Sequence, residues 1–237
     1  MNQTNLFFVF TILATVLCFL FVISSRSVAS SEKKARWFYF FCVAISLTAL
    51  TANLLSVSGV LPMKGILGTI YQALIFRLWI VIGMGIVSIV LSLLWWFGSF
   101  VSISSNQAIG SFVASPYVLR GICFSVSISF LAVEIGKLTH DADMRQFFLD
   151  SGFPVWFLYF VIIAEILGAI GLFLKKLILP AAFGLAILMF GAIFTHYNNG
   201  DSFSDSIEAF HLLILLICII VIRLIHQRGA EQRLNYN

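Results

Sequence analysis

The stretch Val118–Leu138, VLRGICFSVSISFLAVEIGKL, decides the fold of this chain. It is long and apolar enough to cross a bilayer as a helix, since about 20 such residues span the hydrocarbon core. It also contains Arg120, Glu134 and Lys137. A charged side chain inside the membrane costs about 3 kcal/mol or more, so such residues usually face the interior of a helix bundle and find partners there. The stretch therefore predicts a membrane helix with a polar edge that faces other helices.

The composition indicates a membrane protein over the whole chain. Of the 237 residues, 61% are hydrophobic and 10% are charged, and the mean hydropathy is +1.05. A soluble domain has about 45–50% apolar and about 25% charged residues. The net charge of +4 is explained by orientation charge on cytoplasmic loops rather than by binding to nucleic acid. The four cysteines stand singly in apolar runs, a pattern that does not favour disulfides, zinc or iron–sulfur clusters.

Seven apolar runs are long enough to span the membrane, which predicts an all-α protein with seven transmembrane helices. The third run is too long for one simple span, so we expect Gly65–Phe76 to lie at the interface and to lead into a crossing from Arg77 to Phe97. In chain order the runs are Leu6–Ser24, Trp37–Val57, one within Ile66–Phe100, Tyr117–Leu138, Pro154–Leu174, Leu177–Thr195 and His211–Ile225.

The distribution of charge predicts the orientation of these helices. Ten basic residues lie on one side of the seven-helix arrangement, and six acidic residues of the later loops lie on the other. Because a basic excess marks the cytoplasmic face, we expect the N-terminus and the loops His140–Phe153 and Tyr197–Phe210 to be outside and the C-terminus to be cytoplasmic. The first run lacks a positive segment before it and a cleavage site after it, so we interpret it as a retained helix. These features are typical of a multi-pass protein of a bacterial inner membrane.

A shift in composition divides the chain. Residues 1–100 predict a three-helix unit with almost no ionisable side chains in its spans, which would face lipid or a partner protein. Residues 101–116, VSISSNQAIGSFVASP, are uncharged and rich in serine, as in a linker. Residues 117–237 predict a four-helix unit with a short cytoplasmic tail, and this unit contains the charges expected inside the membrane.

The ionisable residues of the four-helix unit form the candidate site. Glu134 and Lys137 are three residues apart and share a helix face. Glu165 lies 11 residues beyond Pro154, about 16 Å along its helix and near the middle of the membrane.

Two histidines are expected at the outer side of the same unit. His196 would end the sixth helix and His211 would begin the seventh, where Glu208 shares a face with His211. Apart from Glu165, the polar groups would thus converge on the outer leaflet. Small residues would let the fifth and sixth helices approach closely and bring His196 towards Glu134 and Lys137. These residues are Gly168, Gly171, Gly184 and Gly191.

The chemistry with the fewest residue requirements is proton transfer beside a lipid-soluble ligand such as a quinone. This chemistry needs only a carboxylate, a histidine and an apolar slot. In this hypothesis the proton-handling, catalytic residues are Glu165, Glu134 and His196, and the ligand-binding residues are Lys137, His211, Glu208 and Arg120. A metal site or axial haem ligation is less favoured, because no close spacing such as HExxH occurs.

Structural interpretations of the same residues stay open. Lys137 would snorkel to the interface or pair with Glu134, and Arg120 would anchor its helix at the inner surface. Glu165 must be protonated or paired at its depth, and it would then fix the packing of the bundle.

Four motifs follow one another over residues 118–225: LRGICFSVSISFLAVEIGKL, FFLDSGFP, AEILGAIGLFL and AAFGLAILMFGAIFTH. Together they resemble the DoxX-like family of small bacterial membrane proteins. The resemblance implies a four-helix core, here preceded by three extra helices. The family pattern points to Arg120, Gly136, Lys137, Gly152, Pro154, Glu165 and Gly168. Some members of this family are linked to quinone-reducing oxidoreductase assemblies, whereas many are accessory membrane proteins.

Two functions follow from these observations. The first is a redox-associated membrane subunit with a polar pocket in the outer leaflet for a quinone or a similar lipid-soluble ligand. The second is a non-catalytic accessory or scaffold subunit of a larger membrane or envelope complex, which docks through the first three helices. A transporter is less favoured, because no inverted repeat is visible. Whether the chain catalyses a reaction stays open, and the expected partners are the lipid bilayer and other membrane-protein subunits.

Overall fold

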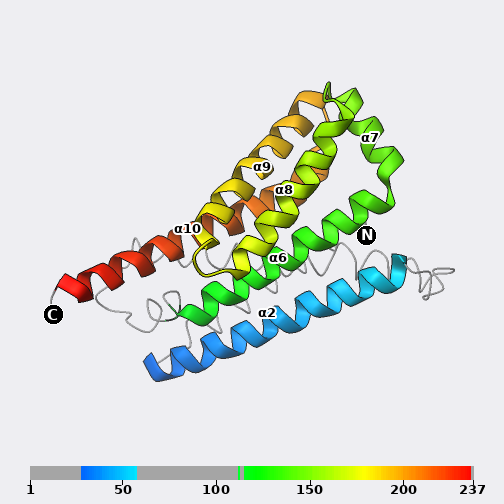
Figure 1. The fold of residues 1–237 in the computed structure, drawn as a ribbon. Coiled ribbons are helices and arrows are strands. Elements are labelled where there is room, and N and C mark those ends of the chain that lie inside the picture. The colour runs from blue at the N-terminus through cyan, green and yellow to red at the C-terminus, as the bar shows by residue number, and fades with distance from the viewer. Residues whose placement is uncertain (1–27, 58–111, 113–114, 236–237) are drawn as a thin grey trace.

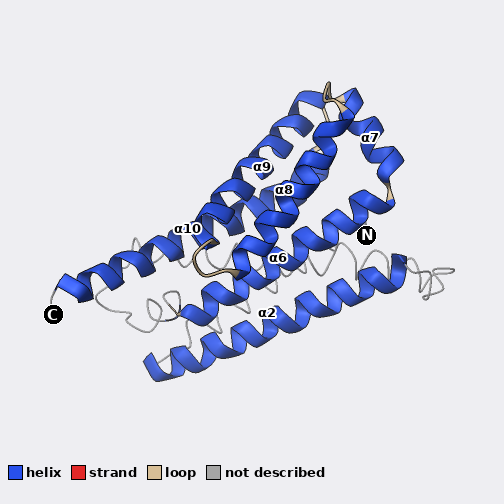
Figure 2. Cartoon of the chain, in the orientation of Figure 1, coloured by secondary structure: helices blue, strands red, loops and turns tan. Residues whose placement is uncertain are grey.

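The computed structural model describes residues 28–57, 112 and 115–235. The regular structure of these residues is helical throughout, as Figures 1 and 2 show. The helices are α2 (Val28–Val57), α6 (Pro116–Thr139), α7 (Asp141–Asp150), α8 (Val155–Phe173), α9 (Ile178–Asn199) and α10 (Phe203–Asn235). The all-α prediction is confirmed for the described part of the chain.

Four of these helices are long and apolar enough to cross a membrane. They are α6, α8, α9 and the segment Glu208–Gln227 of α10. They coincide with the predicted fourth to seventh spans, so the chain is a multi-pass membrane protein with an all-helical fold. The predicted second span, Trp37–Val57, lies within α2, whereas the first and third predicted spans lie outside the described residues.

Two predicted loops are wrong, because they are largely helical. The first, His140–Phe153, contains the ten-residue helix α7. The second, Tyr197–Phe210, is divided between the last turn of α9 and the first turns of α10, and only residues 200–202 connect the two helices. Short polar helices of this kind lack the long apolar runs by which spanning helices are recognised. His211 therefore lies inside α10 and does not begin it.

The ends of α7 and α9 explain why the connections are so short. Gly152 and Gly200 have φ angles of 81° and 75°, a left-handed conformation that glycine adopts at little cost. After α7, the Phe153 amide donates to the carbonyl of Phe148 at 2.8 Å, and the two rings are in contact. After α9, the amide of the residue beyond Gly200 returns to the His196 carbonyl at 3.1 Å. Both are Schellman endings, which satisfy the last carbonyls and reverse the chain.

Helix α6 lies at the centre of the bundle. Of its apolar, membrane-spanning part 67% is buried, against 33% or less of the corresponding parts of α8, α9 and α10. It begins with Ser115 as N-cap, whose hydroxyl accepts a hydrogen bond from the Tyr117 amide, and with Pro116 in the first turn. Figure 1 shows α6 between α2 on one side and the helices α8, α9 and α10 on the other. Several polar residues of α6, among them Ser127, Ser129 and Glu134, are therefore buried between helices.

Helices α2 and α6 lie side by side and run in the same direction (Figure 1). Near the start of the pair, the Arg36 guanidinium lies 5.3 Å from the centre of the Tyr117 ring. Further along, the Ser46 hydroxyl donates to Ser125 at 3.1 Å. Because the helices are parallel, α2 ends and α6 begins at opposite ends of the pair. Phe112, in the last part of the predicted linker, is 1% exposed and belongs to the same buried core.

The glycines of α8 allow close packing against α9, as predicted. A Cβ atom on Gly168 would lie 2.6 Å from the Leu185 side chain, and one on Gly171 would lie 2.8 Å from the Ala181 Cβ. The prediction is wrong for α9, because a Cβ on Gly184 or Gly191 would have no neighbour within 4 Å. The contact therefore uses the glycines of α8, and on α9 the small residue at the contact is Ala181 rather than a glycine.

Candidate functional site

A lysine of α6 lies between two carboxylates on two helices. Lys137 Nζ is 2.7 Å from Oε1 of Glu134 and 2.5 Å from Oε2 of Glu165, and it donates a hydrogen bond to each. Glu134 is on the same helix, three residues earlier, whereas Glu165 comes from α8. We call these three residues the interior cluster. They form a charged link between α6 and α8.

The interior cluster is buried. Glu134 and Glu165 are each 2% exposed, and the Lys137 side chain is 18% exposed. On α8, Glu165 belongs to the buried stripe Leu158, Ile162, Glu165, Ala169 and Leu172, whose spacing of three and four residues is that of one helix face. A carboxylate thus takes a position that the helix pattern assigns to a core residue.

Helix α7 explains why Glu165 meets Lys137. The sequence predicted that Glu165 would lie apart in depth from Glu134 and Lys137, and this was wrong, because Glu165 contacts Lys137. Ten residues of α7, about 15 Å of helix, separate the end of α6 from the start of α8. Helix α8 therefore starts beyond the end of α6. Glu165, near the middle of α8, then lies level with Lys137, two residues before α6 ends. The buried Ser127 hydroxyl donates to the Ala169 carbonyl at 2.9 Å and holds α8 to α6 further along.

The charges of the interior cluster do not balance when all three groups are ionised, because two carboxylates face one ammonium. Glu134 Oε1 and Glu165 Oε2 accept hydrogen bonds from Lys137. Glu134 Oε2 is buried, and it has no hydrogen-bond partner among the described residues. A buried polar atom without a partner is costly, and in native structures it usually marks a proton, a water or a ligand. The cluster is therefore suited to hold or release a proton.

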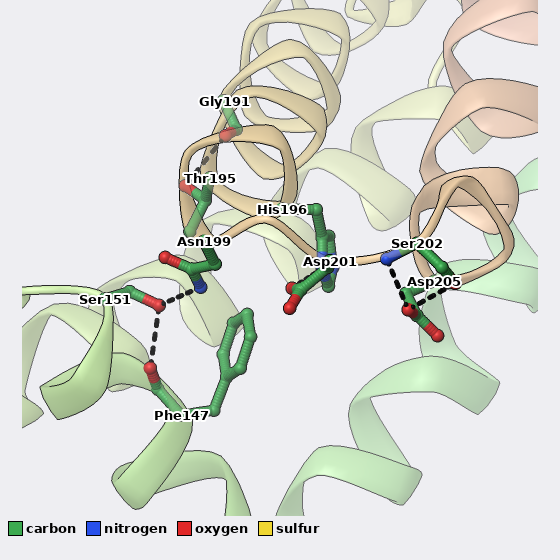
Figure 3. A network of polar contacts seen from close by, with 9 residues as sticks. All are labelled: Phe147, Ser151, Gly191, Thr195, His196, Asn199, Asp201, Ser202 and Asp205. Atoms are coloured by element: carbon green, nitrogen blue, oxygen red, sulfur yellow. Dashed lines mark hydrogen bonds and ion pairs between the residues drawn. The ribbon is translucent and has the colours of Figure 1, made fainter.

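His196 has a different set of partners. It lies in the last turn of α9, where its Nδ1 is 2.7 Å from Oδ2 of Asp201, and its ring lies 5.3 Å from the Phe147 ring of α7 (Figure 3). The acceptor carboxylate places the ring proton on Nδ1, so Nε2 is the proton acceptor of the neutral ring. The His196 side chain is 24% exposed.

Two further sets of hydrogen bonds occur near the α9–α10 connection. One holds the end of α9 against the end of α7, and the other caps the start of α10. The Asn199 amide donates to the Ser151 hydroxyl at 2.8 Å, and Ser151 donates to the Phe147 carbonyl (Figure 3). Asp205 accepts hydrogen bonds from the Ser202 amide and hydroxyl at 3.0 and 2.8 Å, which caps the start of α10. We call residues His196, Asp201, Asn199 and Ser151 the end cluster.

The structure therefore divides the predicted site residues. Glu134, Lys137 and Glu165 meet in the interior cluster, and His196 belongs to the end cluster. The remaining predicted ligand-binding residues lie on other surfaces. Arg120 is exposed near the start of α6, Glu208 is exposed in α10, and His211 is half-buried one turn further along α10. Among the described residues, no group of three or more histidine, cysteine and acidic side chains is arranged to hold a metal ion.

Sequence reasoning missed a second polar contact at α7. Asp141 forms an ion pair with Arg145 and accepts a hydrogen bond at 2.8 Å from the Tyr159 hydroxyl of α8. Hydrogen bonds from Arg145 and Tyr159 hold the pKa of the Asp141 carboxyl below its usual range. The Arg145 guanidinium also lies 5.7 Å from the centre of the Tyr159 ring. The spacing of Asp141 and Arg145 is a visible signal for a helix-surface pair, whereas nothing in the sequence points to Tyr159.

The comparison with protein families agrees with this architecture. The model of the DoxX-like family matches residues 122–221, which extend from the first turns of α6 to the middle of α10. The resemblance inferred from the four motifs is therefore confirmed, and this segment contains the interior and end clusters. No curated protein and no solved structure matches the chain.

Proposed function

We propose that the chain is a redox-associated membrane protein whose interior cluster exchanges protons with a quinone or a similar lipid-soluble ligand. The observation that carries this proposal is the arrangement of Lys137 between Glu134 and Glu165, with one buried carboxylate oxygen left without a partner in the described part of the chain. A quinone takes up two protons when it gains two electrons. In this proposal a partner redox subunit supplies the electrons, and the cluster supplies or accepts protons.

The roles of the residues follow from their surroundings. Glu165 and Glu134 are the proton-exchanging groups, because they are the buried carboxyls. Lys137 stabilises whichever carboxyl is ionised and contacts the ligand, because its side chain is the most exposed of the three. His196, paired with Asp201, would pass protons between the cluster and the aqueous side at the α7 end of the bundle. Arg120, Glu208 and His211 have no assigned step in this proposal.

Quinone binding by the purified protein tests this function directly. A short-chain ubiquinone would be added to the detergent-solubilised chain, and its dissociation constant measured for the wild type, Glu165→Gln and Asp143→Asn. Asp143 is an exposed carboxylate on α7 and serves as the control. We expect Glu165→Gln to weaken binding about tenfold, the effect of losing one charge-assisted hydrogen bond, and Asp143→Asn to leave it unchanged. Equal binding by wild type and Glu165→Gln, or no binding at all, would exclude the proposal.

A non-catalytic accessory or scaffold subunit is the second candidate. The observation that favours it is that Lys137 already bonds both carboxylates, so the cluster can serve to fix α8 against α6. In this case Glu134→Gln and Glu165→Gln would lower thermal stability, quinone would not bind, and native mass spectrometry of gently extracted protein would show stoichiometric protein partners. The two candidates therefore differ in both the ligand and the partner measured.

We also propose the seven-helix topology with the N-terminus outside, the C-terminus cytoplasmic and a location in the bacterial inner membrane. The parallel packing of α2 and α6 supports the helix count alone, because two parallel spans need an odd number of crossings between them. Single cysteines at Lys33 and at Asp143 in a cysteine-free background would test the orientation by labelling with a membrane-impermeant maleimide. Labelling from outside at Asp143 alone is expected, and labelling at Lys33 alone would reverse the orientation.

A further inference from the structure

The end of the bundle opposite α7 contains an arginine that points towards other helices rather than towards lipid. On α10, Leu212, Leu216 and Ile219 are buried, and Arg223 follows Ile219 by four residues on the same face. Arg223 is accordingly half-buried, whereas the next residue, Leu224, is exposed. An arginine that only marked the membrane surface would lie on the outer face of α10, where its long side chain reaches water freely.

The guanidinium of Arg223 is only partly hydrogen-bonded within the described residues. Its Nη2 donates to the Lys175 carbonyl, in the turn between α8 and α9, at 3.3 Å. Its Nε is buried and has no hydrogen-bond partner within the described residues. A guanidinium carries five N–H donors in one plane, and a carboxylate or phosphate satisfies them in pairs. The arginine is therefore oriented by a backbone carbonyl and has no anionic acceptor among residues 28–57, 112 and 115–235.

The α8–α9 turn that Arg223 contacts contains both basic and apolar exposed side chains. Lys175 and Lys176 are exposed in the α8–α9 turn. The residues on either side of these lysines are exposed large apolar side chains: Phe173, Leu174 and Leu177, at 48%, 50% and 46%. Phe173 also contacts the Phe124 ring of α6 at 5.8 Å, so the turn is held against the bundle. A cationic surface directly next to exposed apolar side chains matches the boundary between phosphate and acyl chain in a lipid.

We propose that Arg223, Lys175 and Lys176 bind the phosphate of an anionic phospholipid, whose acyl chains lie against Phe173, Leu174 and Leu177. The phosphate accepts hydrogen bonds from the Arg223 guanidinium, and the two lysines add charge attraction. Basic pockets between membrane helices commonly recognise lipid headgroups in this way. The exposed apolar side chains favour a lipid over free phosphate, because inorganic phosphate has no apolar part to cover them.

The test uses the full-length chain in a neutral detergent. Phosphatidylglycerol or phosphatidylcholine would be titrated in, and the lipid retained would be counted by native mass spectrometry, with the thermal midpoint measured in parallel. Each basic side chain near a membrane surface contributes about fivefold to the preference for anionic lipid. We expect the wild type to retain one phosphatidylglycerol in preference to phosphatidylcholine and to gain thermal stability from it. We expect Arg223→Gln to lower this preference about fivefold, since Lys175 and Lys176 remain.

Two further variants keep the result interpretable if Arg223→Gln does not fold. Lys175→Gln with Lys176→Gln changes only exposed side chains and should fold, and it should lower the preference about 25-fold. Arg145→Gln removes a basic residue at the opposite end and should retain the full preference. Equal retention of both lipids by the wild type, or an unchanged preference in the lysine double variant, would overturn the proposal. An equal thermal shift with inorganic phosphate alone would also overturn it, because the occupant would then be a free anion.

Discussion

The interior cluster and the end cluster are both built from acid–base pairs, yet they differ in burial and therefore in what they contribute. In the interior cluster, Lys137 joins two carboxylates that are each 2% exposed. In the end cluster, His196 and Asp201 form a pair whose side chains are 24% and 30% exposed. Breaking a buried pair leaves an uncompensated charge in a medium that cannot solvate it, whereas water replaces a lost partner at the surface. We therefore expect the loss of such a contact to cost more stability in the interior cluster than in the end cluster.

The largest expected effect comes from removing the cation of the interior cluster. Lys137→Met would leave two buried carboxylates facing each other, so we expect a loss of about 3–5 kcal/mol in the free energy of unfolding. Thermal or denaturant unfolding of the purified protein in detergent measures it. A triple variant, Lys137→Met with Glu134→Gln and Glu165→Gln, removes all three charges and should recover most of this stability. If the single and triple variants are equally unstable, the cost is due to packing and not to charge.

A smaller effect is expected from the close contact between α8 and α9 in the same interior. Gly171→Ala would place a Cβ 2.8 Å from the Ala181 Cβ, which cannot rotate away, so the helices must separate. Overpacking of this kind costs about 1–3 kcal/mol. Gly184→Ala is the matched control, because its Cβ would meet no atom within 4 Å, and it should be neutral or gain up to about 1 kcal/mol from helix propensity. Similar unfolding midpoints for both variants would show that the contact is not tight.

At the end cluster, Asp201→Asn removes the charge that faces His196. Because both side chains are partly exposed, we expect a change in unfolding free energy of about 0–1 kcal/mol, and less in high salt. The measurement is unfolding at low and high ionic strength. A loss comparable to that of Lys137→Met would mean that the end cluster is as important as the interior cluster for holding the helices.

The smallest effect concerns the pH dependence contributed by Asp141. Its pKa is lowered in the folded chain by hydrogen bonds from Arg145 and Tyr159. A carboxyl with a lowered folded pKa contributes stability that is fully present above its unfolded pKa of about 3.9 and is lost as the pH falls through the folded value. Asp141→Asn should therefore be indistinguishable in pH dependence from wild type above about pH 5 and should flatten the loss of stability below about pH 4. An unchanged acid limb in unfolding curves from pH 2 to 6 would contradict this.

Much of the bundle could be predicted because apolar run length is a local property. The bounds of α6 and α8 agree with the predicted spans within one residue at each end, and all four predicted spans of the unit are helices. The motif FFLDSGFP could also be recognised, and its glycine is now explained by the left-handed conformation at Gly152. Helix α7 was missed because it is a short polar helix without an apolar run, and that omission misplaced Glu165.

The sequence by itself determined that this is an all-helical membrane protein and that the charges expected inside the membrane lie in the segment from α6 to α10. It also determined that Glu134 and Lys137 share a helix face. Each of these properties depends only on residues that are near one another in the chain. Only the tertiary structure decided that Glu165 completes the cluster and that His196 turns to Asp201 and α7. It also decided that Arg223 faces the bundle. These contacts depend on how far each helix is displaced along its neighbours, and that displacement is set by α7 and by the turns at Gly152 and Gly200. A change of one helical turn, about 5.4 Å, would pair Lys137 with a different residue of α8.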